Sequence, residues 1–245
     1  MSNTKIEWTD RTWNPVTGCT KHSEGCAHCY AESMSRRLQA MKIAKYQRAF
    51  TLTLHDDSLK EPLRWKRPHN IFVCSMSDLF HEDVPFSFVD KVFETTKLCP
   101  QHRFQILTKR AKRMAEYFEK REVPKNVWIG VTVEGEKYKE RIDYLSKIAA
   151  SVHFISCEPL LEDLGKLNLQ NIQWIIVGGE SGPFARPMQK TWVEKIKKQA
   201  DENGIPFFFK QWGTWGSDGV KRNKKKNGKI LNGEVIHCMP SVCSQ

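Results

Sequence analysis

The sequence predicts an α/β fold in the form of a partial (β/α) barrel, with six or seven parallel strands and outer helices. Three observations predict it. Short apolar runs recur along the chain, segments with helical periodicity separate most of them, and 245 residues with 40% hydrophobic content suffice for a barrel-sized core. Near-continuous apolar strands are typical of a parallel sheet covered on both faces. We expect a single domain over residues 1–245, with a basic extension from about residue 212.

The first half of the chain is expected to begin with a short strand within 6–16, followed by a loop and a helix. The helix is expected over about 30–47, where Met34, Leu38 and Met41 mark an apolar face. Further strands are expected at 71–75 and 104–108, each followed by a helix, at 86–98 and 111–122.

The second half continues the same alternation. Strands are expected at 127–133, 152–156, 174–177 and 206–209, and helices at 137–150 and 192–203. The last helix is expected to stop at Gly204, because glycine is common directly after a helix.

Three cysteines lie within eleven residues of the loop after the first strand. Cys19, Cys26 and Cys29 have the spacing C-x6-C-x2-C, and Gly18 and Gly25 allow a tight backbone around them. Two metal sites suit three thiolates. A [4Fe–4S] cluster would keep one iron open for a small molecule. The other possibility is a tetrahedral zinc site, in which His22 or His28 is the fourth ligand.

The remaining cysteines are scattered, and in a reducing compartment we expect each of them to be a packing residue rather than a metal ligand. They are Cys74, Cys99, Cys157, Cys238 and Cys243. No apolar run is long enough to cross a bilayer, and the N-terminus lacks the apolar core of a signal peptide. We therefore expect a cytoplasmic protein.

The net charge of +11 favours a polyanionic partner, and nucleic acid is the usual one. The segment 221–229 carries six positive charges and follows Trp212 and Trp215. Basic side chains beside aromatic rings are typical of a groove that binds phosphates and stacks bases. The other interpretation of the same segment is a solvated hairpin loop between Trp215 and Ile230.

Polar residues recur where the predicted strands end. In a barrel, the carboxyl ends of the strands carry the site, so these residues are expected to converge above the cysteine loop. Each of them also suits a cap for the helix that follows. They are Ser75, Ser77, Asp78, Thr108, Lys109, Thr132, Glu134, Ser156, Glu158, Gly178, Gly179 and Glu180.

Three cysteines after a first strand, the last two spaced C-x2-C and followed by a helix, resemble those of the radical S-adenosylmethionine enzymes. The resemblance implies that Cys19, Cys26 and Cys29 bind three irons of a [4Fe–4S] cluster. It also implies that S-adenosylmethionine binds the open iron and is cleaved to a 5′-deoxyadenosyl radical. The first pair of cysteines departs from the family, whose common spacing there is three residues rather than six.

The resemblance places further residues at the cofactor. His28 falls where an aromatic residue near the adenine is usual. We include Tyr30 as a further candidate for cofactor binding. Within the superfamily, the resemblance to spore photoproduct lyase extends to the residues that hold the methionine amine and carboxylate, which correspond to Ser77, Asp78 and Lys109. We include Ser75 as a further candidate for cofactor binding. The hydrogen-donating cysteine of that enzyme would fall at Ser75. Cys74, one place away and so on the other side of a strand, is the candidate hydrogen donor.

Three later residues complete the candidate cofactor site: Glu158, Gly179 and Glu180. The Gly-Gly-Glu segment comes several strands too late to hold the methionine amine, as a similar segment does in many members. Its glycines would instead admit the close approach of a ligand. The whole sequence is also similar to a family of short phage-associated proteins that share the wide cysteine motif.

The sequence therefore predicts a radical enzyme with a [4Fe–4S] cluster and S-adenosylmethionine. It is expected to act on DNA, as a lyase that repairs a thymine dimer photoproduct, and to receive electrons from a donor protein. One alternative is a non-catalytic zinc module that binds nucleic acid. Another is a radical enzyme that modifies a different base, a peptide or a metabolite.

Overall fold

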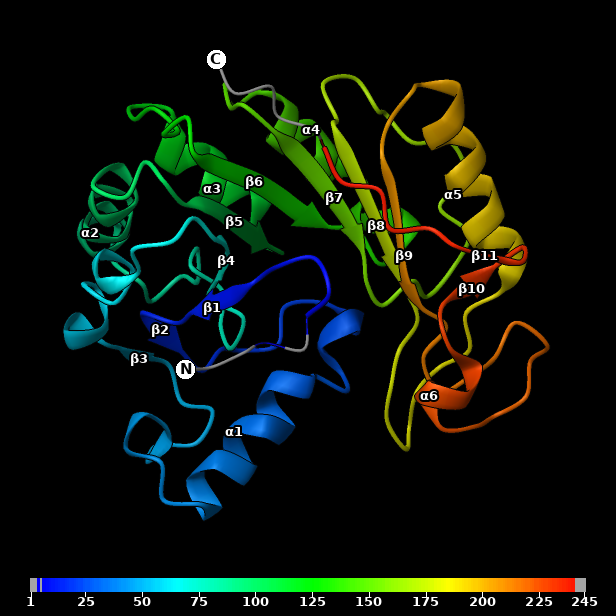
Figure 1. The fold of residues 1–245 in the computed structure, drawn as a ribbon, viewed down its shortest axis with the longest axis horizontal. Coiled ribbons are helices and arrows are strands. Elements are labelled where there is room, and N and C mark those ends of the chain that lie inside the picture. The colour runs from blue at the N-terminus through cyan, green and yellow to red at the C-terminus, as the bar shows by residue number, and fades with distance from the viewer. Residues whose placement is uncertain (1–3, 5, 241–245) are drawn as a thin grey trace. The chain divides into compact units, whose positions relative to one another are not determined.

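The computed structural model describes residue 4 and residues 6–240. It has an α/β fold in which seven strands form one sheet in the order β1-β4-β5-β6-β7-β8-β9 (Figure 1). This is the strand order of successive β/α units, and the predicted partial-barrel class is confirmed. Contacts divide the chain into two compact units, and the division falls inside β6. Among the described helices, none is long and apolar enough to cross a membrane.

The first unit comprises residues 1–130 and 147–151. The carboxyl ends of its first three sheet strands lie side by side, because Trp13 pairs with Val73 and Val73 with Ile106 in parallel register. Its strands are β1 (Arg11–Trp13), β2 (Val16–Thr17), β3 (Thr53–Leu54), β4 (Asn70–Val73), β5 (Arg103–Thr108) and the start of β6 (Val127–Thr132). Its helices are α1 (Tyr30–Ala40), α2 (Phe86–Lys97) and α3 (Ala111–Phe118), with 3-10 turns at Glu24–Cys26, Ala44–Tyr46, Asp56–Ser58 and Pro62–Arg64.

The second unit comprises residues 131–146 and 152–245. Its sheet strands are β7 (His153–Cys157), β8 (Trp174–Gly178) and β9 (Phe207–Gln211), and a small hairpin contains β10 (Ile230–Leu231) and β11 (Glu234–Val235). Its helices are α4 (Glu140–Ser146), α5 (Lys190–Glu202) and α6 (Lys224–Asn227), with a 3-10 turn at Glu136–Tyr138. Gly204 follows α5 with a φ of +63°, the left-handed conformation expected of a glycine that stops a helix.

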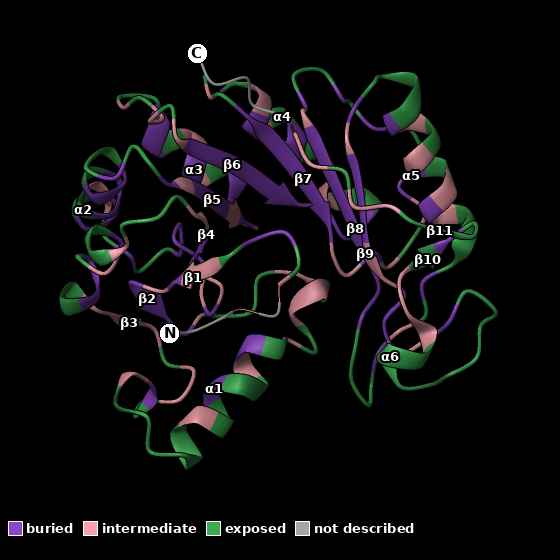
Figure 2. Cartoon of the chain, in the orientation of Figure 1, coloured by how far each residue is buried: buried purple, intermediate pink, exposed green. Residues whose placement is uncertain are grey.

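The strands of the sheet are largely buried, as Figure 2 shows in purple. Every residue of β6, β7 and β8 is buried, so their side chains are covered on both faces. Continuous apolar runs are the sequence pattern of such strands. Exposed residues gather on the helices and loops (Figure 2).

Helix α1 is shorter than predicted, and of the three residues predicted for its buried face only Leu38 packs there. Met34 and Met41 are exposed by 39% and 59%, whereas Ala31 and Ser35 are buried. Small side chains let the helix lie close to its neighbours, and Leu38 packs with Ala31 on the same cluster. The buried stripe therefore starts at Ala31 and repeats at i+4 and i+7, and the methionines lie outside it.

The strand predicted to reach residue 75 ends at Val73. Cys74 has a φ of +57°, a left-handed conformation that interrupts an extended strand. The alternation of side chains along a strand therefore does not apply to Cys74 and Ser75, and the predicted opposite orientation of the two lacks its basis.

Candidate functional site

The cysteine loop is held against the end of β4. The amide of Gly18 donates to the carbonyl oxygen of Met76 at 3.1 Å, and the Ser77 hydroxyl donates to the Gly18 carbonyl. Gly18 has a φ of +77°, and a Cβ there would overlap the carbonyl of Thr51. Glycine is thus required where the chain turns from β2 into the loop.

All three cysteines of the loop are half-buried free thiols. Cys26 closes a 3-10 turn, and Cys29 directly precedes α1. Burial, with a contribution from Asp78, raises the pKa of Cys19 to about 12. Burial also raises the pKa of Cys29. Without a metal these two thiols therefore stay protonated at neutral pH, and metal binding would release their protons.

Arg110 connects the first cysteine to the ends of β4 and β5. Its buried guanidinium lies 3.7 Å from the sulfur of Cys19 and 3.1 Å from the hydroxyl of Thr20. The same group pairs with Asp78 at 3.2 Å and with Glu82 at 2.8 Å. Arg110 was not among the predicted site residues. Four of the five residues in 109–113 are basic, and such a run is typical of a solvated surface. The place of Arg110 directly after β5 was the one available signal.

Asp78 is buried and fully engaged by the chain itself. One carboxylate oxygen accepts from the Thr108 hydroxyl at 2.7 Å and from the amide of Phe80 at 3.0 Å. The other accepts from the amide of Lys109 at 3.1 Å and from Arg110. Four donors match the roughly four acceptor positions of a carboxylate. In this structure Asp78 holds the segment after β5 and the Arg110 guanidinium in place.

The other predicted residues of the first unit lie around the same loop. Ser75 donates to the side-chain oxygen of Asn14 at 3.1 Å, and its carbonyl accepts from the hydroxyl of Tyr30. The positive charge of Lys109 acts on Cys29 and opposes the rise in the pKa of that thiol. His28 is exposed. Cys74 is 3% exposed, so its thiol is enclosed by the protein.

His81 fixes the residue that follows Cys19. The amide of Asp83 donates to Nδ1 of His81 at 3.1 Å, so Nε2 carries the proton and donates to the Thr20 hydroxyl at 2.8 Å. Burial and the nearby Arg110 lower the pKa of His81. The imidazole is therefore neutral at physiological pH.

We expect the stability of the protein to fall as the pH is lowered from about 7 to 5.5. Unfolded His81 binds a proton near pH 6.5, whereas the folded imidazole resists protonation, so the unfolded state binds more protons in this window. Urea unfolding at several pH values measures the slope. His81→Gln should reduce that slope by up to about 1.4 kcal/mol per pH unit. The pKa values of His55 and His102 are also lowered, so these two residues should account for the part of the slope that remains in His81→Gln. Equal slopes in the two proteins would contradict the assignment.

In the second unit, glutamates at three strand ends each pair with a cation. Glu158 lies 2.9 Å from Lys210, and the Ser156 hydroxyl donates to it at 3.3 Å. The buried carboxylates of Glu134 and Glu180 pair with other partners. Those pairs are Glu134 with Arg141 at 2.7 Å and Glu180 with Arg186 at 2.7 Å. All three glutamates are thus held by groups of their own unit.

The Gly-Gly-Glu segment is tightly packed against its own unit. A Cβ on Gly178 would lie 2.6 Å from the carboxylate of Glu158, and a Cβ on Gly179 would overlap the carbonyl of Trp212. Packing against a backbone atom therefore requires a glycine at position 179, whereas the neighbour of Gly178 is the end of a flexible side chain. Trp212 is 2% exposed, and its indole donates to the Ile230 carbonyl at 2.8 Å. Trp212 is thus not available to stack on a base.

Within the described part of the chain, no three His, Cys, Asp or Glu side chains are gathered closely enough to hold a single metal ion. The donor set suits a cluster, in which each thiolate binds a different iron. Three free thiols occupy one loop, the guanidinium of Arg110 lies 3.7 Å from the sulfur of Cys19, and the positive charge of Lys109 acts on Cys29. Cations beside thiolates favour an anionic cluster. These residues fit such a group.

A family model described as "Protein of unknown function (DUF5131)" matches residues 3–240. The chain belongs to this family. No curated protein matches the DUF5131 chain.

Two solved structures that match the DUF5131 chain are of spore photoproduct lyase. One is complexed with dinucleoside spore photoproduct and is 12% identical, with a TM-score of 0.47. The other is a double mutant with bound AdoMet and dinucleoside spore photoproduct, and is 10% identical, with a TM-score of 0.47. Each match covers 82% of this chain, which spans 63% of the length of the lyase chain.

Proposed function

We propose that the protein is a radical S-adenosylmethionine enzyme that holds one [4Fe–4S] cluster on Cys19, Cys26 and Cys29. The observation that carries the proposal is the cysteine loop itself. Its three free thiols lie in one loop, bound to the end of β4 through Gly18 and to the segment after β5 through Arg110. The bound groups would supply one-electron cleavage of a sulfonium and, from it, a radical that abstracts hydrogen.

The residues around the loop have distinct roles in this proposal. Lys109 would pair with the carboxylate of the cofactor's methionine, since its positive charge already acts on the thiol of Cys29. Ser75 and Ser77 would face its amine, and His28 and Tyr30 its adenine. Asp78 would contribute by holding Arg110 and the backbone of Lys109. Glu158, Gly179 and Glu180 stay candidates for the cofactor in the second unit.

The substrate we propose is DNA, and the finer proposal is repair of a thymine photoproduct, the substrate type of spore photoproduct lyase. A damaged base leaves the stack at the lowest cost, which would make it the easiest base to bring to the radical. Cys74 as hydrogen donor stays a prediction, and at 3% exposure its thiol would have to become exposed to reach a substrate. An electron donor protein is the second partner, and the cytoplasm the proposed location.

The test is anaerobic reconstitution of the full chain with iron and sulfide, followed by reduction with S-adenosylmethionine. We expect a brown protein with about four irons that releases 5′-deoxyadenosine. Cys26→Ala should lose most of the iron and all of the cleavage. Cys238→Ala, which removes an exposed cysteine outside the loop, should retain both.

Two outcomes would overturn the proposal. One is a colourless protein that binds zinc, which would support the zinc module. The other is cleavage that persists in Cys26→Ala. Cleavage that depends on Cys26 and is accelerated only by a peptide or metabolite would keep the cluster and reject DNA.

A further inference from the structure

We propose that two connected loops of the second unit form a binding surface for single-stranded nucleic acid, with Phe184 as the side chain that stacks on a base. The surface consists of residues 180–186 and 213–229 and is called the basic lobe below. This inference rests on the proposed function only in its choice of nucleic acid as the substrate. In Figure 1, the loop after β8 and the helix α6 lie beside each other.

Phe184 is displayed at the tip of a closed loop. The amide of Ala185 donates to the carbonyl of Gly182 at 3.2 Å, which makes Pro183 and Phe184 the central residues of a turn. Phe184 is 75% exposed. Arg186 closes the base of the loop on Glu180, with contacts of 2.7 and 2.9 Å. A large aromatic side chain is thus presented to solvent by a loop whose shape is already set.

The second loop of the basic lobe supports the first. The amide of Gly182 donates to the Thr214 hydroxyl at 2.9 Å, and the indole of Trp215 donates to the Ala185 carbonyl at 2.6 Å. The ammonium of Lys221 donates to the Pro183 carbonyl at 2.7 Å. A positive charge is therefore fixed one residue away from Phe184. Trp215 has its indole N–H engaged and serves as a support rather than as the stacking ring.

The basic segment is connected by hydrogen bonds to the loop that supports Phe184. The amide group of Asn227 donates to the carbonyls of Gly213 and Thr214 at 3.0 and 2.8 Å. The Asn223 side chain caps α6 by accepting from the amide of Lys225. These bonds tie α6 to the segment that supports Phe184.

Three successive lysines of α6 are exposed: Lys224, Lys225 and Lys226. Within the described residues, no carboxylate pairs with any of them, whereas Arg222 nearby pairs with Asp218 at 2.6 Å. Like charges held close together repel one another, and a chain of phosphates would relieve that repulsion. Phosphate contacts by lysines and stacking on one exposed ring describe recognition of a single strand, whose bases are free to stack on protein.

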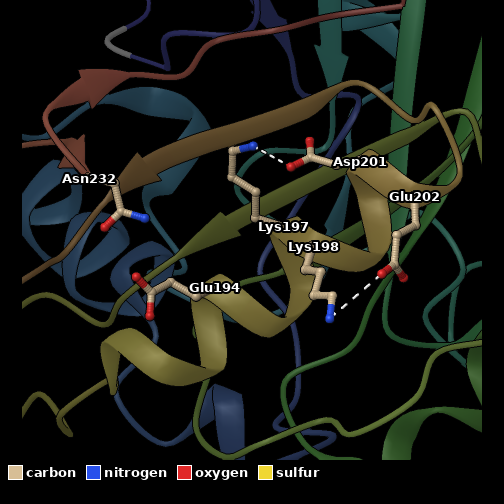
Figure 3. A pocket seen from close by; sticks show the side chains of 6 residues that line it. All are labelled: Glu194, Lys197, Lys198, Asp201, Glu202 and Asn232. Atoms are coloured by element: carbon tan, nitrogen blue, oxygen red, sulfur yellow. Dashed lines mark hydrogen bonds and ion pairs between the residues drawn. The ribbon is translucent and has the colours of Figure 1, made fainter.

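Helix α5 provides the contrasting surface. A shallow hollow of about 270 Å³ there is lined by side chains of both signs (Figure 3). Lys197 pairs with Asp201 at 2.6 Å and Lys198 with Glu202 at 3.8 Å. Lys190 of the same helix pairs with Glu194 at 3.4 Å. Lysines that already have partners offer little to phosphates, so α5 serves as the control.

The experiment is titration of a fluorescein-labelled 16-nucleotide thymidine oligomer with the full chain, followed by anisotropy at several salt concentrations. Phe184→Leu should weaken binding roughly 5- to 100-fold, because a base–aromatic stack is lost, and Phe184→Trp should restore it. The triple change of Lys224, Lys225 and Lys226 to alanine should make the slope of log affinity against log salt shallower by about 2. Each phosphate contact to a single strand contributes roughly 0.7 to this slope, and three contacts would be lost. The same change at Lys190, Lys197 and Lys198 alters the net charge equally and should leave the slope almost unchanged.

Two results would overturn the proposal. One is equal loss of binding in both triple variants, which would mean that net charge alone attracts the oligomer. The other is unchanged binding in Phe184→Leu. Release of 5′-deoxyadenosine is scored separately. Radical cleavage without oligomer binding would reject the basic lobe as a binding surface and support the proposed enzyme. Oligomer binding without cleavage would support the binding surface and reject the proposed enzyme.

Discussion

Gly179→Ala should destabilise the protein by about 3 kcal/mol or more, because the new methyl group would overlap a backbone atom. The obstacle is the carbonyl oxygen of Trp212. Trp212 is fixed by its buried side chain and by its amide, which donates to the Gly228 carbonyl at 3.1 Å, so it has little freedom to move aside. Guanidinium unfolding followed by circular dichroism measures the loss.

Gly165→Ala is the matched control for Gly179. Gly165 has a φ of +57°, but a Cβ there would meet no atom within 4 Å. The change should therefore lower the free energy of unfolding only by the cost of placing alanine in a left-handed conformation, about 1–2 kcal/mol. If Gly179→Ala cost no more than Gly165→Ala, the close approach at Trp212 would not exist in solution.

Arg110→Ala should destabilise the protein by about 3–5 kcal/mol, because it leaves the buried carboxylate of Asp78 without its cation. In the reconstituted protein it should also make the reduction potential of the proposed cluster more negative. The reason is that it removes a positive charge and a hydrogen-bond donor 3.7 Å from the sulfur of Cys19. Chemical unfolding and anaerobic redox titration measure the two effects.

Lys112→Ala is the control for Arg110. It removes an exposed charge from the same basic run and should change stability by no more than about 0.5 kcal/mol. Arg110→Lys distinguishes charge from geometry, since it keeps the charge but loses the planar guanidinium that reaches Asp78, Glu82 and Thr20 together. A potential that is the same in Arg110→Ala and wild type would show that Arg110 has only a structural role.

Most of the fold followed from hydrophobic patterning, and its exceptions have physical causes. The strands at 127–133 and 174–177 stood out because both faces of such strands are buried. The buried stripe of α1 was misassigned because Ala31 and Ser35 have little hydrophobic signal, and their small size is what lets the helix pack. The two-residue strands β2, β3, β10 and β11 are too short to produce a periodic pattern.

The part of the candidate site that depends on local spacing could be proposed from the sequence, whereas the part that depends on tertiary contacts could not. The cysteine motif is local, so the spacing of three cysteines and two glycines is enough to recognise it. Arg110 reaches Cys19 across 91 positions of sequence, and nothing in a basic run shows which member turns inward. Phe184 has the opposite difficulty, because a single phenylalanine after proline does not reveal that a turn holds it outward.

The division of the chain into two units bears on how the protein can be dissected. The backbone passes between the units at residue 130, returns for residues 147–151, and crosses again to continue to the C-terminus. Domains that fold alone are usually joined by a flexible linker with few contacts across it, but here the first crossing lies within strand β6. A truncation after Gly130 would remove part of the first unit together with the second. The cysteine loop and the basic lobe therefore cannot be isolated by one cut, and point substitutions in the whole chain are the way to separate their contributions.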